Sequence, residues 1–374
     1  MSGQMIGFLG IVAMLILLML RMPIGIAMLL VGIIGFGMLN GWEQALYALG
    51  SYPYSYSAVY ELAVIPLFVL MGNCAGSSGM SRDLYNAAYA WVGHWRGGLA
   101  SATIVACAGF AAVSGSSVAS AVTMGRVCLP EMFRYKYDAR LATGTVAAGG
   151  TLGILIPPST AFVIYAILTE QSIGRLLLAG FLPGIMLAAL FILAITIWTR
   201  LDPKLGPSGP VASAKVRLQT LANSGPMILI GAFVFGPFLA LSGLPETLAN
   251  YISGLEVPRI VILLILIGIY IILGMFLEGF SILVLTMPIV IPIVEALHYD
   301  LIWFGVIMVI VLEMGLISPP VGINVFVVKG LVPDVPMGEI FKGIWPFFIA
   351  MGAAVALLIA FPEIALFIPN SMIR

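Results

Sequence analysis

The sequence has few charged residues. Only 9% of its 374 residues are Asp, Glu, Lys or Arg, whereas 61% are hydrophobic and the mean hydropathy is +1.15. A soluble domain carries about a quarter charged residues, so this excess of apolar side chains cannot be buried in one soluble core. The composition therefore predicts a polytopic, all-α membrane protein.

Other chemistry is scarce as well. The 16 basic residues balance 16 acidic residues, which argues against a nucleic-acid binder. Two His and three Cys offer neither metal-ligand spacing nor a triad-like pattern, so we expect no enzyme, no transition-metal site and no organic cofactor. No basic residue precedes the apolar stretch 5–20, so we interpret it and 22–39 as two retained helices, not as a signal peptide.

One uncharged window has a polar centre. Ser114-Gly115-Ser116-Ser117 divides 97–126 into two arms, each of which is shorter as a helix than a bilayer core of about 30 Å. Backbone exposed at that depth is tolerated only against protein or a water-filled cavity. The pattern predicts a re-entrant helical hairpin; a single Ser/Gly-rich span packed on a neighbour is the alternative.

A second window, 141–169, contains Pro157-Pro158 near its middle. Proline lacks an N–H and disfavours helix in the preceding residue, so two in succession predict a broken helix rather than a simple kink, which is the alternative. Broken helices place unpaired backbone groups at membrane depth, where many carriers build ion and substrate sites.

The second half of the chain repeats this pattern. At one constant offset in the numbering, the matched positions are Pro130 and Pro292, Tyr137-Asp138 and Tyr299-Asp300, Gly153 and Gly315, and Pro157-Pro158 and Pro319-Pro320. Because Gly and Pro set backbone geometry, their matching order predicts a matching chain path. The predicted organisation is N-terminal scaffold helices (1–61), repeat A (62–199, hairpin 97–126, broken helix 141–169), a cytoplasmic linker (200–225), repeat B (226–361, hairpin 259–296, broken helix 301–328) and a C-terminal tail (362–374).

Basic residues predict the orientation. If the linker is cytoplasmic, thirteen of the sixteen basic residues lie inside and only Arg175, Arg259 and Arg374 lie outside. The positive-inside rule favours this arrangement. It places the two hairpins on opposite sides, so the repeats are predicted to be inverted, with a site near the midplane between them.

Four segments resemble one protein family. "AAVSGSSVAS" (111–120), "GTVAAGGTLGILIPPS" (144–159), "GMFLEGFSILVLTMPIVIP" (274–292) and "LISPPVGINVFVVKG" (316–330) are similar to the large membrane subunit of TRAP (tripartite ATP-independent periplasmic) transporters, DctM-like proteins. The resemblance covers nearly the whole chain. It implies a sodium-driven symporter in the bacterial inner membrane that imports an organic acid, such as a C4-dicarboxylate, by an elevator mechanism. It also implies two partners, a separate small four-helix membrane subunit and an extracytoplasmic solute-binding protein.

The chain departs from the family at the start of repeat B. Family members usually carry two further spans there, but 200–225 is polar and too short for a span. We therefore expect the scaffold helices of the second half to be missing. Such a chain is a natural short variant, an engineered minimal form or an inactive remnant.

The resemblance places sodium where the hairpin tips meet the helix breaks. Sodium prefers oxygen ligands, which bare carbonyls, hydroxyls and a carboxylate supply. The predicted sodium-site residues are Ser114, Gly115, Ser116, Ser117, Gly153, Pro157, Glu278, Gly279, Gly315, Ser318, Pro319 and Gly322. The predicted substrate-site residues, chosen for hydroxyls, amides and helix N-termini that suit an anion, are Ser117, Ser159, Thr160, Ser281 and Asn324.

Two acids lie in apolar stretches, Glu278 at the second tip and Glu313 two residues before Gly315. An intramembrane acid is a functional candidate. Glu313 can carry a proton, bind an ion indirectly, or pair with Arg126 or Lys329; we favour a structural partnership.

Three functions are compatible with the sequence. The first is a transporter subunit that requires its binding protein. The second is a stand-alone sodium–carboxylate symporter of related fold, and the third is a shortened remnant that does not transport.

Overall fold

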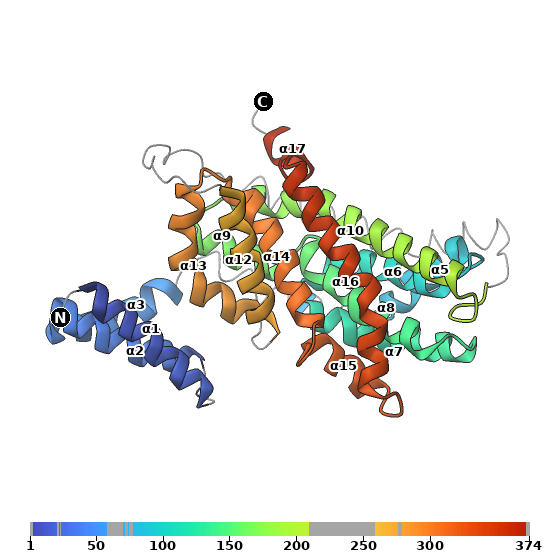
Figure 1. Ribbon diagram of the computed structural model, residues 1–374, viewed down its shortest axis with the longest axis horizontal. Helices are drawn as coiled ribbons and strands as arrows, with labels where there is room; N and C mark the ends of the chain where they lie inside the picture. The colour runs from blue at the N-terminus through green and yellow to red at the C-terminus, as the bar shows by residue number, and fades with distance from the viewer. Residues whose placement is uncertain are drawn as a thin grey trace. The chain divides into compact units, whose positions relative to one another are not determined.

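The computed structural model describes residues 3–20, 22, 24–57, 70–71, 74, 78–208, 259–275 and 279–371 (Figure 1). All of its described elements are helices, as the composition predicts. Most of the first span of repeat A, residues 209–225 of the linker, the first span of repeat B, Glu278 and the last three residues lie outside the described part.

The chain divides into two compact units, Met1–Val64 and Ile65–Arg374. The first unit contains α1 (Gly3–Met19) and α2 (Ile24–Asn40), whose bounds are close to those of the two predicted helices. It also contains a third helix, α3 (Trp42–Ser57), which was not predicted from the sequence. Glu43 lies in the first turn of α3, where a negative charge is favourable. Consecutive helices pack together, α1 on α2 and α2 on α3.

The second unit repeats one helix order. Its helices are α5 (Met80–Val92), α6 (Gly98–Ser114), α7 (Ser117–Arg134), α8 (Ala139–Leu155), α9 (Thr160–Leu168), α10 (Ile173–Leu201), α12 (Arg259–Gly274), α13 (Gly279–Ala296), α14 (Leu301–Ile317), α15 (Ile323–Leu331), α16 (Met337–Ala360) and α17 (Glu363–Ser371). The bounds of α7 and α8 match those of α13 and α14 at the same offset as the sequence repeat, and α9 matches α15 with a slip of one position.

Local signals explain the matched helix starts. Asp138 caps α8 by accepting a hydrogen bond from the Arg140 N–H, and Asp300 caps α14 at the equivalent position. Two residues before these caps, Lys136 and His298 have φ of 59° and 55°. Both halves therefore turn into their central helix through a left-handed residue and an aspartate cap.

Both predicted helix breaks are present. Helices α8 and α9 bend by 44° at Pro157-Pro158, and α14 ends one residue before Ser318-Pro319-Pro320. Both Pro–Pro bonds are cis. Helices α6 and α7 pack against each other and are separated only by Gly115 and Ser116, at the predicted tip. Helix α7 continues to Arg134, beyond the predicted boundary at 126, because Arg126 is exposed on its surface and does not end the helix.

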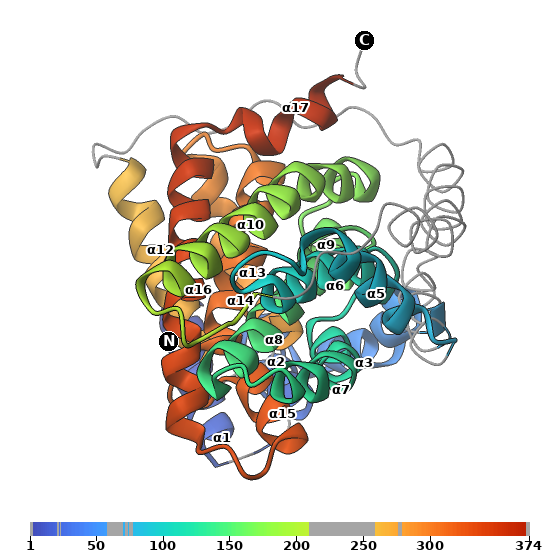
Figure 2. The same cartoon turned by 90° about the vertical axis from the view of Figure 1, so that its right-hand side faces the viewer.

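The two central helices are almost fully buried. Helix α8 is buried from Leu141 to Leu155 and α14 from Ile302 to Ile317. Helix α16 packs on both, and Figure 2 shows α10 crossing α16. A Cβ on Gly144 of α8 would collide with the carbonyl oxygen of Gly343 on α16, so these helices meet backbone to backbone.

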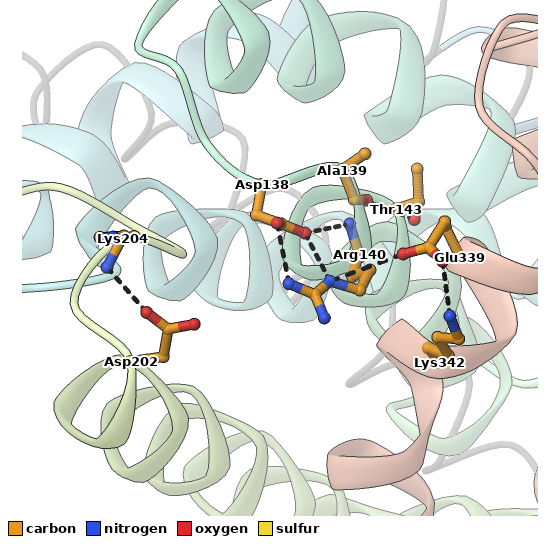
Figure 3. Close-up of polar contacts among 8 residues, drawn as sticks. All are labelled: Asp138, Ala139, Arg140, Thr143, Asp202, Lys204, Glu339 and Lys342. Atoms are coloured by element: carbon orange, nitrogen blue, oxygen red, sulfur yellow. Dashed lines mark hydrogen bonds and ion pairs between the residues drawn. The ribbon is translucent and has the colours of Figure 1, made fainter.

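Charged residues connect the start of α8 to the start of α16 (Figure 3). Arg140 forms a two-pronged ion pair with Asp138, with both N···O distances at 3.0 Å, and lies 3.7 Å from Glu339 at the start of α16. Glu339 also pairs with Lys342 at 2.7 Å. The cluster joins α8 to α16 at the end that the sequence predicts to be cytoplasmic.

By length and composition alone, two described helices, α10 and α16, can cross a membrane, or three spans if the bent pair α8–α9 counts as one. Shorter apolar helices include α6, α12 and α14. The amphipathic helix α5 buries the face that carries Leu84, Tyr85 and Ala88. The predicted tail contains α17, which packs on α10.

Candidate functional site

The hairpin tip of repeat A, both helix breaks and the start of α13 meet at one cavity of about 80 Å³. Its described lining comes from the tip and from α7, α8, α9, α13, α14 and α15. The lining residues are Ser116, Ser117, Val118, Ile154, Thr160, Ala161, Ile164, Gly279, Leu312, Glu313, Leu316 and Ile323. Segments from the two halves of the chain therefore share one small space.

Four helix N-termini border this cavity. Ser117, Thr160, Gly279 and Ile323 are the first residues of α7, α9, α13 and α15, and all four line it. The first N–H groups of a helix have no partner within the helix, and the helix dipole makes this end positive. The backbone around the cavity is thus suited to a negatively charged group.

A buried polar network crosses between the two halves. The Ser117 hydroxyl donates a hydrogen bond of 2.8 Å to Glu313 Oε2 on α14, and Asn324 Nδ2 on α15 donates one of 2.6 Å to Ser117 Oγ. The three residues are at most 4% exposed. The network ties the hairpin of repeat A to the broken helix of repeat B.

Other hydroxyls near the breaks bond to the local backbone. Thr160 Oγ1 donates to the carbonyl of Gly115 at 2.9 Å, which holds the start of α9 to the hairpin tip. Ser318 donates to the carbonyl of Met314 at 2.6 Å. Ser159 donates to the carbonyl of Ile154 and accepts from the Phe162 N–H as the cap of α9. These hydroxyl protons are already committed, so towards a ligand the oxygens act as acceptors.

Glycine allows the tip to approach the central helix. A Cβ on Gly153 would lie 2.5 Å from Ser120 Oγ and 2.6 Å from the carbonyl oxygen of Ser116. In repeat B, a Cβ on Gly315 would lie 2.5 Å from Gly274 Cα. Both contacts exclude any larger residue, so these glycines serve close packing between backbones.

The structure brings together about half of the predicted site residues. Those at the cavity, or hydrogen-bonded to a residue that lines it, are Gly115, Ser116, Ser117, Ser159, Thr160, Gly279 and Asn324, with Ser114 donating to the Ser116 carbonyl at 3.2 Å. Those in neither group among the described residues are Gly153, Pro157, Gly315, Ser318, Pro319 and Gly322. Glu278 and the side chain of Ser281 lie outside the described part.

Glu313 has a different contact from those considered in the sequence analysis. It accepts from Ser117, whereas Lys329 Nζ donates to the carbonyls of Pro333 and Val335, and Arg126 is exposed. The apolar residues that line the cavity, such as Leu312, were not predicted as site residues, because nothing in the sequence distinguishes them from the other apolar residues of the chain.

A larger, open cavity of about 540 Å³ lies at Tyr299, Asp300 and Trp303. None of its described lining residues is a predicted site residue. This larger cavity is therefore not the candidate functional site, despite its volume.

Two broken helices and a hairpin tip around one small cavity are an arrangement typical of membrane carriers. The comparisons with known proteins agree. The family model described as "Tripartite ATP-independent periplasmic transporter, DctM component" matches residues 11–225 and 219–364. This chain belongs to that family.

Curated relatives carry different cargoes. The C4-dicarboxylate TRAP transporter large permease protein DctM of Pseudomonas aeruginosa is 31% identical over 370 residues, covering 83% of this chain and 86% of the relative. The sialic acid TRAP transporter large permease protein SiaM of Vibrio cholerae is 27% identical, covering 99% of this chain and 98% of the relative. An isethionate TRAP transporter permease protein DctMQ of Oleidesulfovibrio alaskensis is 29% identical, covering 91% of this chain and 64% of the relative.

The alignments also bear on the length of the chain. The comparison with SiaM runs over 435 positions, whereas this chain has 374 residues, so at least 61 aligned positions have no residue here. The two segments matched by the family model overlap at 219–225, which is the last part of the predicted linker.

Proposed function

We propose that this chain is the large permease subunit of a sodium-coupled symporter that imports an organic acid in cooperation with a separate small membrane subunit and an extracytoplasmic binding protein. The chain would work in the bacterial inner membrane. One observation carries the proposal: four helix N-termini and a set of acceptor oxygens lie at the same small cavity.

The hydrogen bonds divide the cavity between an anion and a cation. Because Ser117 and Thr160 give their hydroxyl protons to Glu313 and to the Gly115 carbonyl, they cannot donate to a carboxylate. The backbone N–H groups at the helix starts remain for the carboxylate of the substrate, except those of Ala119, Thr160 and Phe162, which donate to Ser116 Oγ, the Gly115 carbonyl and Ser159 Oγ. The hydroxyl oxygens suit a hard cation, and so does the buried Asn324 Oδ1, which has no hydrogen-bond partner among the described residues.

Sodium, when bound, would supply the driving force by making uptake depend on its gradient. The residues of this chain that would hold it are those with oxygen facing the cavity, Ser117 foremost, because Glu313 and Asn324 fix its orientation. We also propose that the two halves are inverted repeats and that their hairpins and broken helices move together against a frame, as an elevator. The matched caps and breaks of the two halves are the observations behind that proposal.

Reconstitution tests the proposed function. Proteoliposomes with the full complex should take up labelled C4-dicarboxylate, sialic acid or isethionate only when an inward sodium gradient, the small subunit and the binding protein are all present. Replacing sodium by choline at equal ionic strength should abolish uptake. Uptake by the large chain alone would instead establish a stand-alone symporter.

The short linker favours a second candidate, a remnant that does not transport. The alignment positions with no residue here support a missing pair of scaffold helices at the start of repeat B. Sodium-dependent uptake by the reconstituted complex would reject this candidate. No uptake of any carboxylate tested, together with stable assembly of the complex, would support it.

A further inference from the structure

Glu313 is a buried acid on an otherwise apolar helix. It is 1% exposed, lines the cavity and lies shortly before the Pro319-Pro320 break, among Leu312, Met314 and Leu316. Burying a carboxylate is costly unless hydrogen bonds compensate. One compensating contact is the Ser117 hydroxyl, on a helix of the other repeat. The position of Glu313 is therefore poorly explained by packing of α14 alone.

The chemistry of this contact is one-directional. An ionised carboxylate only accepts hydrogen bonds, so the single proton of Ser117 points towards Glu313. The Asn324 amide on α15 donates to the same Ser117 oxygen. Donor and acceptor together leave Ser117 Oγ with one lone pair, which can act only as an acceptor. A hydrogen bond to a charged group also makes the donating oxygen more negative.

We infer that Glu313 and Asn324 are positioning residues that turn Ser117 into an acceptor-only ligand for the coupling cation. Glu313 acts through Ser117. The inference rests on the proposed function, because it assigns Ser117 to the cation and removes it from the residues that hold the substrate carboxylate. Without the Glu313 carboxylate, the Ser117 proton can turn towards the cavity and oppose a cation there.

The repeat provides an internal control. At the constant offset of the repeat, the counterpart of Glu313 is Thr151, whose hydroxyl donates to the Ala148 carbonyl within its own helix. Thr151 is fully buried and does not line the cavity. A substitution of Thr151 therefore changes a buried polar side chain at the position equivalent to Glu313 but leaves the hydrogen bonds of Ser117 in place.

Sodium binding can be measured without transport. The full chain, purified with its small subunit, is heated at increasing NaCl with choline chloride holding the ionic strength constant, and the unfolding midpoint gives the half-saturating sodium concentration. Glu313→Gln and Ser117→Ala should each raise that concentration about tenfold or more, the size expected for a charge-assisted hydrogen bond. Thr151→Ala, which leaves Ser117 and both of its hydrogen-bond partners in place, should leave it close to the wild-type value.

A double variant separates positioning from independent effects. If Glu313 acts through Ser117, then Glu313→Gln combined with Ser117→Ala should be no worse than the more damaging single change. The inference would be overturned if the two single increases in half-saturating sodium concentration multiplied in the double variant, or if Glu313→Gln had a normal sodium requirement. Either result would leave the proposed function intact. A wild-type complex whose unfolding midpoint does not respond to sodium would overturn both. If Glu313→Gln does not yield folded protein, Asn324→Ala tests the second bond to Ser117, with the same expected rise.

Discussion

The two broken helices follow the same path but carry different side chains. Helices α8 and α14 both begin after an aspartate cap and end at a Pro–Pro pair. Around the break of α14 lie Glu313 and Asn324, whereas their counterparts in repeat A are Thr151 and Ala161. Ser117 at the start of α7 likewise corresponds to Gly279 at the start of α13. The backbone is repeated, but within the described residues the buried polar network lies on one diagonal, between the hairpin of repeat A and the break of repeat B.

This difference shows that two requirements act on separate residues. Caps, glycines and prolines determine where each helix starts and stops, and they match in the two halves. The polar residues determine what the cavity can bind, and they do not match. Predictions that exchange features between the halves test this separation.

The largest expected effect comes from the packing of α8. Gly144→Val gives α8 the side chain that α14 carries at the equivalent position, Val306. The added atoms would meet the Gly343 backbone, so we expect a loss of more than about 3 kcal/mol in the free energy of unfolding, or no folded protein. Size-exclusion chromatography and thermal unfolding of the purified complex measure it. Gly352→Ala on α16, where a Cβ meets nothing within 4 Å, is the control.

The second effect separates Ser117 from its counterpart. In sodium-free buffer, Ser117→Ala leaves Glu313 without this donor and Asn324 without this acceptor, so it should cost about 1–3 kcal/mol in the free energy of unfolding. Gly279→Ala should cost nothing, because its Cβ would come no closer than 4.0 Å to Leu312 Cδ1 and Ala favours helix. Equal losses from chemical denaturation of both variants would contradict the asymmetry of the network.

The third effect distinguishes the caps of the two short helices. Gly322, which caps α15, has φ of 62°, so Gly322→Ala should cost about 1–2 kcal/mol in the free energy of unfolding. Ser159 caps α9 from extended backbone and also donates to the buried Ile154 carbonyl. Ser159→Gly should therefore cost a few tenths of a kcal/mol for the cap and about 1 kcal/mol for the lost hydrogen bond. Denaturant midpoints of the two variants measure both losses, and a loss at Ser159 no larger than the share of the cap would show that its bond to Ile154 contributes nothing.

The smallest effect concerns the cap of α8. Hydrogen bonds from Arg140 hold the pKa of the Asp138 carboxyl below its ordinary value of 3.8. The stability contributed by the ionised form is therefore present above about pH 4 and is lost as the pH falls through the lower, folded-state pKa. Asp138→Asn should reduce this acid-sensitive part, at most about 1 kcal/mol because the side chain is partly exposed. Thermal midpoints between pH 3 and pH 7 test it, and an unchanged acid response in Asp138→Asn would argue against the assignment.

Much of the helix pattern was predictable. The hairpin tip at Ser114–Ser117 and both Pro–Pro breaks were predicted near the residues where helices end, because Gly, Pro and small polar residues act locally on the backbone. Helix α3 and the extension of α7 past Arg126 were missed. A charge interrupts an apolar run in the sequence, but it does not interrupt a helix whose surface exposes it.

The candidate site was only partly predictable, and Glu313 shows why. The sequence identified it as a buried acid, since a charge in an apolar stretch is conspicuous, and it suggested basic partners. One of its partners, Ser117, lies in the other repeat and is not basic. Ser159 and Ser318 were equally plausible ligands by residue type, yet the structure gives their protons to carbonyls of the preceding helix.

The sequence by itself determined that the protein is a helical membrane permease with two matched halves, because hydrophobicity, Gly, Pro and Asp act over a few residues at a time. Only the tertiary structure decided which polar groups meet. Hydrogen bonds require atoms within about 3 Å of each other, and residues of distant segments reach that separation only after the helices have packed. The cavity, its four helix N-termini and the Ser117–Glu313–Asn324 network are products of that packing.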